Sequence, residues 1–475
     1  MIKTKLTTIT LVLTVLLSGC SVHRSAVKEP LVDMPSSYST KGESPSPPIG
    51  KWWTRFEDDK LNQLMEQAFK YNLDIAQSYE RLRQAQTAIR ITNAERGLFV
   101  NVDASGGRAR QPGMTGAVTA DTYSLSAAAG FEIDLWGKLR SKAKAARLDA
   151  LASEQNLKSM FISISAQLTD LYFLAAEQRA QLELSDQTIA SFQDTLDRVN
   201  RRYSAGLVPA VDVYQTRQNL ASAKAQRPLF ESRLTESLNA IAVLTGNFPR
   251  QEIDGYTDQL IAPPFFPAGL PSQLLISRPD IQAALFSLMA SDKRIGAAIA
   301  DRFPSFNLIG SYGGSSDEVK SVLDSPNIFW NILLQAAQPI LDSGRRRAEV
   351  DRTEAVFREN LAVYHKTVLN AFREIEDALA GIRASEERIK MLNETVSASD
   401  NSLRLALDRY MNGLTDYLPV LTAQLSHFNT KSSLLAERRQ LISDTVQLAR
   451  ALGGEWTDQV TSQYISHIKT EEKEK

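Results

Sequence analysis

The side chains that most often carry chemistry are few and scattered in this chain. It has one cysteine, Cys20, and four histidines, His23, His365, His427 and His467, and no two of these histidines stand four residues apart as in helical metal sites. Neither the Gly-x-Ser-x-Gly turn of serine hydrolases nor a phosphate-binding P-loop is present. We therefore predict that the protein is not an enzyme and holds no metal and no cofactor. Its net charge of −1 over 475 residues gives no reason to expect a nucleic-acid partner.

The segment before Cys20 predicts the fate of its thiol. A basic start and an apolar run from Leu11 to Leu17 are typical of a secretory signal, so we expect residues 1–19 to be removed. The run ends in Leu17-Ser18-Gly19-Cys20, which resembles the signal of bacterial lipoproteins. That resemblance implies cleavage before Cys20 and a covalent lipid on its sulfur. Ser21, where inner-membrane lipoproteins usually carry Asp, favours the outer membrane. The alternative is an ordinary signal peptide in which Cys20 has no role.

Both ends of the remaining chain are predicted to lack a fixed structure. Residues 20–60 begin with a segment rich in Ser and Pro, so we expect an acylated tether there. Residues 454–475 form a charged tail, which we expect to be disordered from about Ser466. The chain between these segments must supply the fold.

A long helix is predicted over residues 137–203. Every seventh residue of its second half is apolar or aromatic, and an interleaved series is mostly apolar, which is the spacing of helices that wind around one another. The first series is Phe161, Leu168, Ala175, Leu182, Ile189, Leu196 and Tyr203. At about 1.5 Å per residue this helix would be ~100 Å long, too long and too charged to cross a membrane. It needs partner helices to cover its apolar seam.

The partner lies in the same chain. Adding 207 to each position of the series gives Val368, Ile375, Ile382, Ile389, Val396, Leu403 and Tyr410, which are again apolar or aromatic. The same offset maps Gly137 on Gly344 and Gly206 on Gly413. One constant offset over such a length indicates a duplicated unit.

The duplication divides the chain into two repeats. We assign the first repeat to residues 61–246 and the second to residues 276–453, joined by a proline-rich crossing linker over 247–275. Each repeat is predicted to hold a helix, a β-hairpin, a long helix and a return helix. The hairpins are expected at 98–134 and 304–341, the long helices at 137–203 and 344–410, and the return helices at 211–246 and 418–453.

Each hairpin alternates apolar with polar or small residues, as membrane strands do. In the first one we expect a loop from Gln111 to Asp121. The side chains expected to face lipid are Tyr123, Leu125, Phe131, Trp330, Ile332 and Leu334. Four strands cannot close, and an open sheet edge is not tolerated in lipid, so several chains must combine. Two chains give eight strands with a filled interior, whereas three give twelve strands and room for a channel.

Basic residues open each long helix, where they oppose the helix dipole. They are Lys138, Arg140, Lys142, Lys144 and Arg147 in the first repeat and Arg345, Arg346, Arg347 and Arg352 in the second. Because each cluster directly follows a membrane strand, one interpretation is contact with outer-membrane lipid phosphates. The other is a solvated helix face.

Together these features resemble TolC-type outer-membrane efflux proteins, in particular the lipoprotein branch that partners RND-type pumps. The resemblance covers roughly residues 17–455. Besides Leu17 to Cys20, it is carried by Trp52-Trp53 with Phe56, by Asp134-Leu135-Trp136-Gly137-Lys138, by two Arg-Tyr-x-x-Gly-Leu turns, and by Pro263-Pro264 leading to Leu274-Leu275 and Arg278-Pro279-Asp280. It implies a mostly α fold with membrane β. In the implied homotrimer, four strands per chain form a 12-stranded barrel in a Gram-negative outer membrane, above a periplasmic α-barrel of long helical hairpins.

The resemblance also implies a function. It is that of a passive trimeric duct in a tripartite efflux system, which receives drugs, toxic compounds or metal ions from an inner-membrane RND-type pump through a periplasmic adaptor (membrane fusion protein). Two alternatives stay open, an outer-membrane duct for type I secretion and a non-conducting coiled-coil tether or adhesin.

The turns at the ends of the long helices are the candidate functional sites. Gly206 and Gly413 are placed as helix C-caps. The family resemblance makes the tips at Gly206, Leu207, Gly413 and Leu414 the docking points for the adaptor. A duct open to the periplasm would leak, so we also expect a resting gate there, formed by Asp416, Asp212, Arg202, Tyr203, Arg409 and Tyr410, with three copies of Asp416 in one ring if that turn points inward as in the family. Asp416 corresponds to Pro209 of the first repeat, and its alternative role is to cap the return helix.

Overall fold

The computed structural model describes residues 50–113, 116–249, 260, 262–267 and 274–474, together with five single residues nearer the N-terminus. The predicted signal peptide, Cys20 and most of the predicted linker lie outside these residues. Up to the end of the first repeat the helices are η1 (Trp52–Phe56), α2 (Asp59–Tyr71), α3 (Leu73–Ala94), α4 (Lys138–Ser204) and α5 (Ala210–Leu244). From the start of the second repeat onward they are α6 (Leu274–Ser277), α7 (Pro279–Ala300), η3 (Val319–Ser321), η4 (Ser325–Asn327), α8 (Arg345–Met411), α9 (Leu418–Leu452) and α10 (Trp456–Glu474). The strands are β1 (Phe99–Gly113), β2 (Gly116–Glu132), β3 (Ser305–Ser316) and β4 (Ile328–Ala337).

The chain folds as two compact units, which we call the strand unit and the helical unit. The strand unit includes Glu80–Glu154 and Ala283–Lys366, and the helical unit includes Gln155–Gln282 and Thr367–Lys475. The predicted fold class, mostly α with four β-strands in a duplicated unit, is confirmed. One stretch of α4 is apolar enough to pass as a membrane span, but 61% of it is buried inside the protein, as expected for a core helix.

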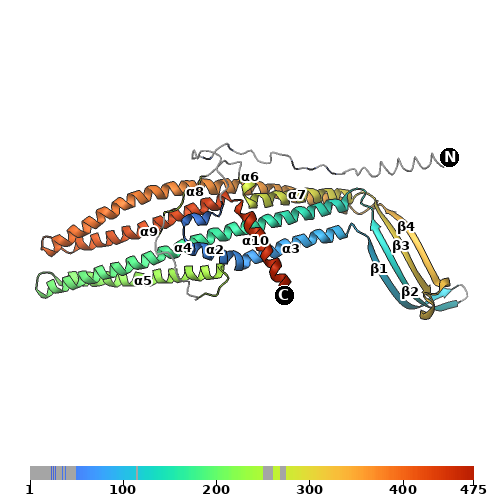
Figure 1. Ribbon diagram of the computed structural model, residues 1–475, viewed down its shortest axis with the longest axis horizontal. Coiled ribbons are helices and arrows are strands. Elements are labelled where there is room, and N and C mark those ends of the chain that lie inside the picture. Colours follow the sequence, from blue (N-terminus) through green and yellow to red (C-terminus); the bar gives the residue numbers. More distant parts are fainter. Residues whose placement is uncertain are drawn as a thin grey trace. The chain divides into compact units, whose positions relative to one another are not determined.

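The strand unit carries one antiparallel sheet in the order β1-β2-β3-β4 (Figure 1). Phe99 pairs with Gly130 in the first hairpin, and Ser305 pairs with Ala337 in the second. The second pair follows from the first by adding 206 to the β1 residue and 207 to the β2 residue, so both hairpins have the same register. The order also leaves β1 and β4 as edges, each with one unpaired side within the chain.

The predicted loop of the first hairpin is wrong. The segment from Gln111 to Asp121 instead continues both strands, with Gln111 paired to Val118 and only two residues left between β1 and β2. Small residues were interpreted as loop formers, but a regular ladder accommodates them because its stability comes from backbone hydrogen bonds to the opposite strand.

Most side chains predicted to face lipid are exposed in the single chain. Trp330, Ile332 and Leu334 are 72%, 73% and 61% exposed, and Leu125 and Phe131 are also exposed, whereas Tyr123 is half-buried. Such a concentration of exposed apolar side chains is unfavourable in water and suits a membrane environment.

In the helical unit the two repeats make equivalent hydrogen bonds and close backbone contacts. Asn72 Nδ2 donates to the Leu244 carbonyl at 2.9 Å, and Arg278 Nη1 donates to the Ala451 carbonyl at the same distance. A Cβ on Gly246 would lie 2.7 Å from the Tyr71 oxygen, and one on Gly453 would lie 2.6 Å from the Ser277 oxygen. Each return helix therefore ends against the same junction of its own repeat.

The predicted tether is shorter than expected. Trp52, Trp53 and Phe56 are at most 3% exposed, and α2 is capped by Asp58, whose carboxylate accepts from the backbone N–H groups of Lys60 and Leu61. The last part of the 20–60 segment, from Trp52 onward, is therefore part of the core, because burying three aromatic rings outweighs the entropy of a free chain.

The prediction of a disordered tail is also wrong, since α10 runs from Trp456 to Glu474. Trp456, Val460 and Tyr464 are buried at helical spacing. The Trp456 ring lies 4.8 Å from that of Trp53, centroid to centroid, and the Tyr464 ring lies 5.8 Å from that of Phe161. Asp458 and Lys469 lie on the exposed side of this docked helix.

Candidate functional site

The two tips of the helical unit end in the same hydrogen-bonded turn. At the end of α4 the N–H of Leu207 donates to the Arg202 carbonyl, and the N–H of Gly206 donates to the Tyr203 carbonyl, both at 2.9 Å. At the end of α8, Leu414 donates to Arg409 and Gly413 to Tyr410 in the same way. Gly206 and Gly413 have φ values of 71° and 72°, a conformation that favours glycine. This is the Schellman pattern, which satisfies the last carbonyls of each helix.

Each turn presents a leucine to solvent. Leu207 is 66% exposed and Leu414 is 67% exposed, and Val211, Tyr214 and Leu418 beside them are also exposed. Their backbone groups are already bonded within the turn, so the side chains have no structural task there. Exposed apolar residues on a rigid turn are the kind of surface that a protein partner covers.

Beneath the turns lies an apolar cluster that joins the helical hairpin of α4 and α5 to that of α8 and α9. Its buried members are Phe192, Leu196, Val199, Val213, Leu220, Tyr410, Tyr417 and Val420. The cluster holds the ends of α4, α5, α8 and α9 together. Polar side chains at these ends are therefore held in place by packed helices.

Three predicted gate residues meet at this cluster, of which Tyr410 is a member, and we call Arg202, Tyr410 and Asp212 the tip lock. Arg202 Nη1 donates to the Met411 carbonyl at 2.6 Å, and its guanidinium carbon lies 5.1 Å from the Tyr410 ring centroid. The Tyr410 hydroxyl donates to Asp212 Oδ2 over a long 3.5 Å. The tip lock therefore connects the end of α4 to the end of α8 and the start of α5.

The other three predicted gate residues lie outside this contact. Tyr203, Arg409 and Asp416 are all exposed. No side-chain capping bond is made at the start of α9, so within the described part of the chain Asp416 does not cap that helix. Its charge is nevertheless near enough to act on Asp212. The Met411 carbonyl and buried Tyr417 were not predicted, since nothing in the residue pattern distinguishes them from ordinary helix-end positions.

Protonation and burial of the tip lock are coupled. Burial raises the pKa of Asp212, and the charge of Asp416 acts in the same direction, against the hydrogen bond from Tyr410. Burial and the charge of Asp212 raise the pKa of Tyr410 to about 12. The Asp212 pKa is higher in the packed tip than in water. The contribution of Asp212 to the stability of the packed tip is therefore complete at a pH below the ordinary pKa of aspartate, and it is lost as pH rises through the raised value. Acid therefore stabilises the packed arrangement of the tip lock.

Comparison with known proteins now relates these features to a family. A sequence model of the family described as outer membrane efflux protein matches residues 64–247 and 270–454. The chain belongs to the outer membrane efflux protein family. The resemblance found in the sequence is thereby confirmed, and with it the location in the outer membrane.

Relatives of this outer membrane efflux protein are similar over most of their length. The chain is 32% identical to the solvent efflux pump outer membrane protein SrpC of Pseudomonas putida over 407 residues, which cover 85% of this chain and 87% of the relative. It is 28% identical to the cation efflux system protein CusC of Escherichia coli, with 93% and 96% covered. Among solved structures, the outer-membrane channel OprN has a TM-score of 0.85 at 26% identity, covering 92% of this chain and all of that one.

Two double variants test the gate residues. Removing the tip lock with Arg202→Ala and Tyr410→Phe is expected to raise the resting conductance in a planar bilayer, because several weak contacts of about 0–1 kcal/mol each are lost together. Asp416→Ala with Arg409→Ala is expected to raise conductance and reduce block by divalent cations, if the turn points inward as in the family and three Asp416 carboxylates form a ring there. Arg201→Ala, on the exposed side of the same helical turn, is the matched control and should change neither.

The pH dependence gives a second readout of the same lock. Resting conductance of the unaltered protein should fall as pH is lowered through the raised pKa of Asp212. Asp212→Asn, which is neutral at every pH, should keep the low conductance and remove this dependence. An unchanged pH profile in Asp212→Asn, or unaltered conductance in both double variants, would mean that the gate lies elsewhere.

Proposed function

We propose that the protein is the outer-membrane duct of a tripartite efflux system. In this proposal three copies form a passive channel that carries small molecules from an inner-membrane RND-type pump and its periplasmic adaptor to the exterior. The single observation that carries the proposal is the four-stranded sheet with apolar side chains exposed and two edges unpaired within the chain. Such edges must be paired in lipid, and twelve strands from three chains leave room for a channel.

The proposed cargo is a class of small molecules and not one compound. The relatives are named for solvents and for cations, so the family's members differ in what they export. The channel is proposed to catalyse no covalent step, and the choice of cargo then belongs to the pump. Drugs, toxic compounds and metal ions all remain within the proposed class.

The test is single-channel recording of the purified protein in planar bilayers. A duct of this kind gives discrete conductance steps and migrates as a trimer. A tether or adhesin would give no steps, and that result would overturn the proposal.

The lipid on Cys20 is part of the proposal and has its own test. Labelled palmitate should be incorporated into the unaltered protein and absent from Cys20→Ala, because no other cysteine is available. Conductance should survive in that variant, since the barrel itself holds the protein in the membrane. Ser21→Ala is the matched control and should remain labelled, whereas a labelled Cys20→Ala would contradict the lipoprotein signal.

A further inference from the structure

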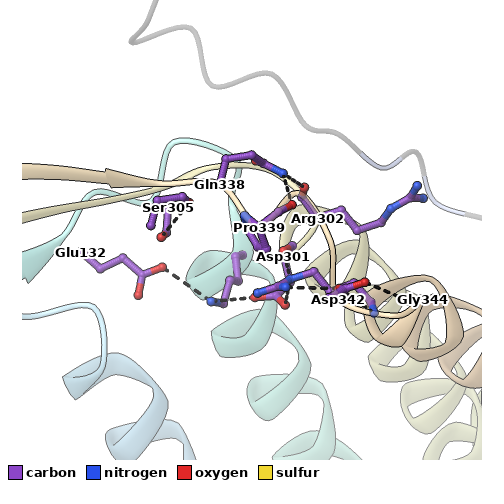
Figure 2. Close-up of polar contacts among 11 residues, drawn as sticks. Glu132, Asp301, Arg302, Ser305, Gln338, Pro339, Asp342 and Gly344 are labelled. Carbon is purple, nitrogen blue, oxygen red and sulfur yellow. Dashed lines mark hydrogen bonds and ion pairs between the residues drawn. The ribbon is translucent and has the colours of Figure 1, made fainter.

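A charged cluster in the strand unit ties the two repeats together. Lys138, at the start of α4, places its Nζ 2.9 Å from Asp301 Oδ1, just beyond α7. Arg346, at the start of α8, donates from Nε to Asp301 Oδ2 at 3.0 Å and to the Asp301 carbonyl at 2.8 Å. Figure 2 shows Asp301 in the middle of these contacts, with Glu132 and Asp342 on either side. Lys138 and Arg346, for which lipid contact was one interpretation, are therefore engaged within the protein.

The bond between Lys138 and Asp301 lies directly below a strand seam. Lys138 follows β2, and Asp301 precedes β3, which is the strand that pairs with β2. The seam ends at the backbone bond from the Ile133 N–H to the Phe306 carbonyl, 2.8 Å long. Partial burial alone would lower the pKa of Lys138, but the hydrogen bond to Asp301 and its charge raise it instead, so the ammonium form is held at this place.

Each participant has a counterpart in the other repeat. By the offsets of the two hairpins, β2 corresponds to β4 and β3 to β1, while Lys138 corresponds to Arg345 and Asp301 to Glu95. Opposite charges are thus retained at both corresponding positions. Within the described ranges, however, Arg345 and Glu95 are exposed and form no ion pair, and they stand beside the two unpaired edges of the sheet.

We infer that β4 of one copy pairs with β1 of a second copy in the register of β2 with β3, and that Arg345 of the first copy forms an ion pair with Glu95 of the second. The inference rests on the proposed trimeric duct and specifies how its subunits join. In β2 and β3, Ala129 pairs with Gly310. The corresponding pair between copies is Ala336 with Ala104.

The proposed seam between β4 of one copy and β1 of another lacks the aromatic contacts that stand beside the β2–β3 seam within a chain. Trp136 Nε1 donates to the Pro304 carbonyl at 2.8 Å, and the Trp136 ring stacks on that of Phe303 with centroids 5.0 Å apart. The corresponding residues, Ser343 and Gly97, have no rings to stack. The ion pair therefore supplies a larger share of the contact between copies than its equivalent does within one chain.

Charge reversal tests the ion pair in the full-length protein. Glu95→Lys and Arg345→Glu should each lower the temperature at which trimers resistant to SDS dissociate, by about 2–4 °C. Combining them restores opposite charges and should recover the original temperature. Arg347→Glu is the matched control, because it makes the same charge change two residues further along α8. Its counterpart in the first repeat, Arg140, forms no ion pair with Asp301 within the described residues. Reversal without effect, or a double variant weaker than either single one, would overturn the ion pair.

Cysteine pairs test the register. Ala104→Cys with Ala336→Cys should link copies covalently under oxidation or with a short bifunctional thiol reagent. Ala104→Cys with Gln335→Cys should not, because a shift of one residue points the side chains to opposite faces. Linking of the shifted pair alone, or of neither pair, would overturn the register.

The outcomes separate this inference from the proposal beneath it. If the unaltered protein is a conducting trimer while the linkage and reversal results disagree with expectation, only the join between copies is wrong. If it forms no trimer and no channel, the proposed function itself fails.

Discussion

Replacing Leu207 and Leu414 with aspartate is expected to abolish efflux while a conducting trimer remains. Both side chains are about two-thirds exposed, and both backbone N–H groups keep their bonds to the helix ends whatever side chain they carry. The buried cluster beneath the turns contains neither residue. The substitution therefore removes an apolar contact surface and adds a charge that an adaptor would have to desolvate, without disturbing the fold.

The measurement compares survival of cells at a toxic concentration of cargo with the conductance of the purified variant. Leu207→Met with Leu414→Met is the control, because it keeps apolar side chains of similar size and should retain efflux. The two single Asp variants show whether both turns are needed. Normal survival of the double Asp variant would place the adaptor contact elsewhere on the protein.

Replacing Arg278 with alanine is expected to destabilise the helical unit by roughly 3 kcal/mol. Arg278 is 7% exposed and binds Asp280 through Nε at 3.0 Å and through Nη2 at 2.6 Å. It also binds Glu374 at 2.9 Å and the last turn of α9 through the Ala451 carbonyl. Truncation removes the guanidinium from two carboxylates and a carbonyl, and leaves Asp280 with the Ile281 N–H and Glu374 with Arg450 at 3.6 Å. Both carboxylates are partly exposed, so we expect the lower end of the usual range for a broken buried pair.

Thermal unfolding followed by circular dichroism measures this loss. Arg278→Lys keeps the charge but cannot bind Asp280 with two nitrogens, so it should be intermediate. The counterpart in the first repeat supplies a matched comparison. Asn72→Ala loses the bond to Leu244 and the cap of α3, where Asn72 accepts from Asp74 and Ile75, and should cost about 1–2 kcal/mol. Equal losses at both positions would mean that the charged network adds nothing.

Features that repeat along the chain were predicted from the sequence. The seam from Phe161 to Tyr203 follows a period that only a helix satisfies, and its copy 207 residues later confirms the pattern independently. The glycine turns were predicted for the same reason, since Gly206 and Gly413 adopt a backbone conformation that few other residues tolerate.

Features that depend on distant partners were missed. Trp456, Val460 and Tyr464 have helical spacing, but only contact with Trp53 and Phe161 gives α10 something to pack against. The tip lock shows the same limit. Tyr203 and Tyr410 are equivalent in sequence, yet one is 48% exposed and the other 3%, because only Tyr410 lies beside Asp212 and Arg202 of the other repeat within the chain.

The contact between Trp53 and Trp456 has a consequence for biosynthesis. A core that uses residues from both ends of the chain cannot close until the last helix has been synthesised. Until then Trp53 and Phe161 lack the contacts of Trp456 and Tyr464, and partly made chains that expose this apolar surface are prone to aggregate. Chains that stop short of α10 are therefore expected to aggregate or to be degraded instead of assembled.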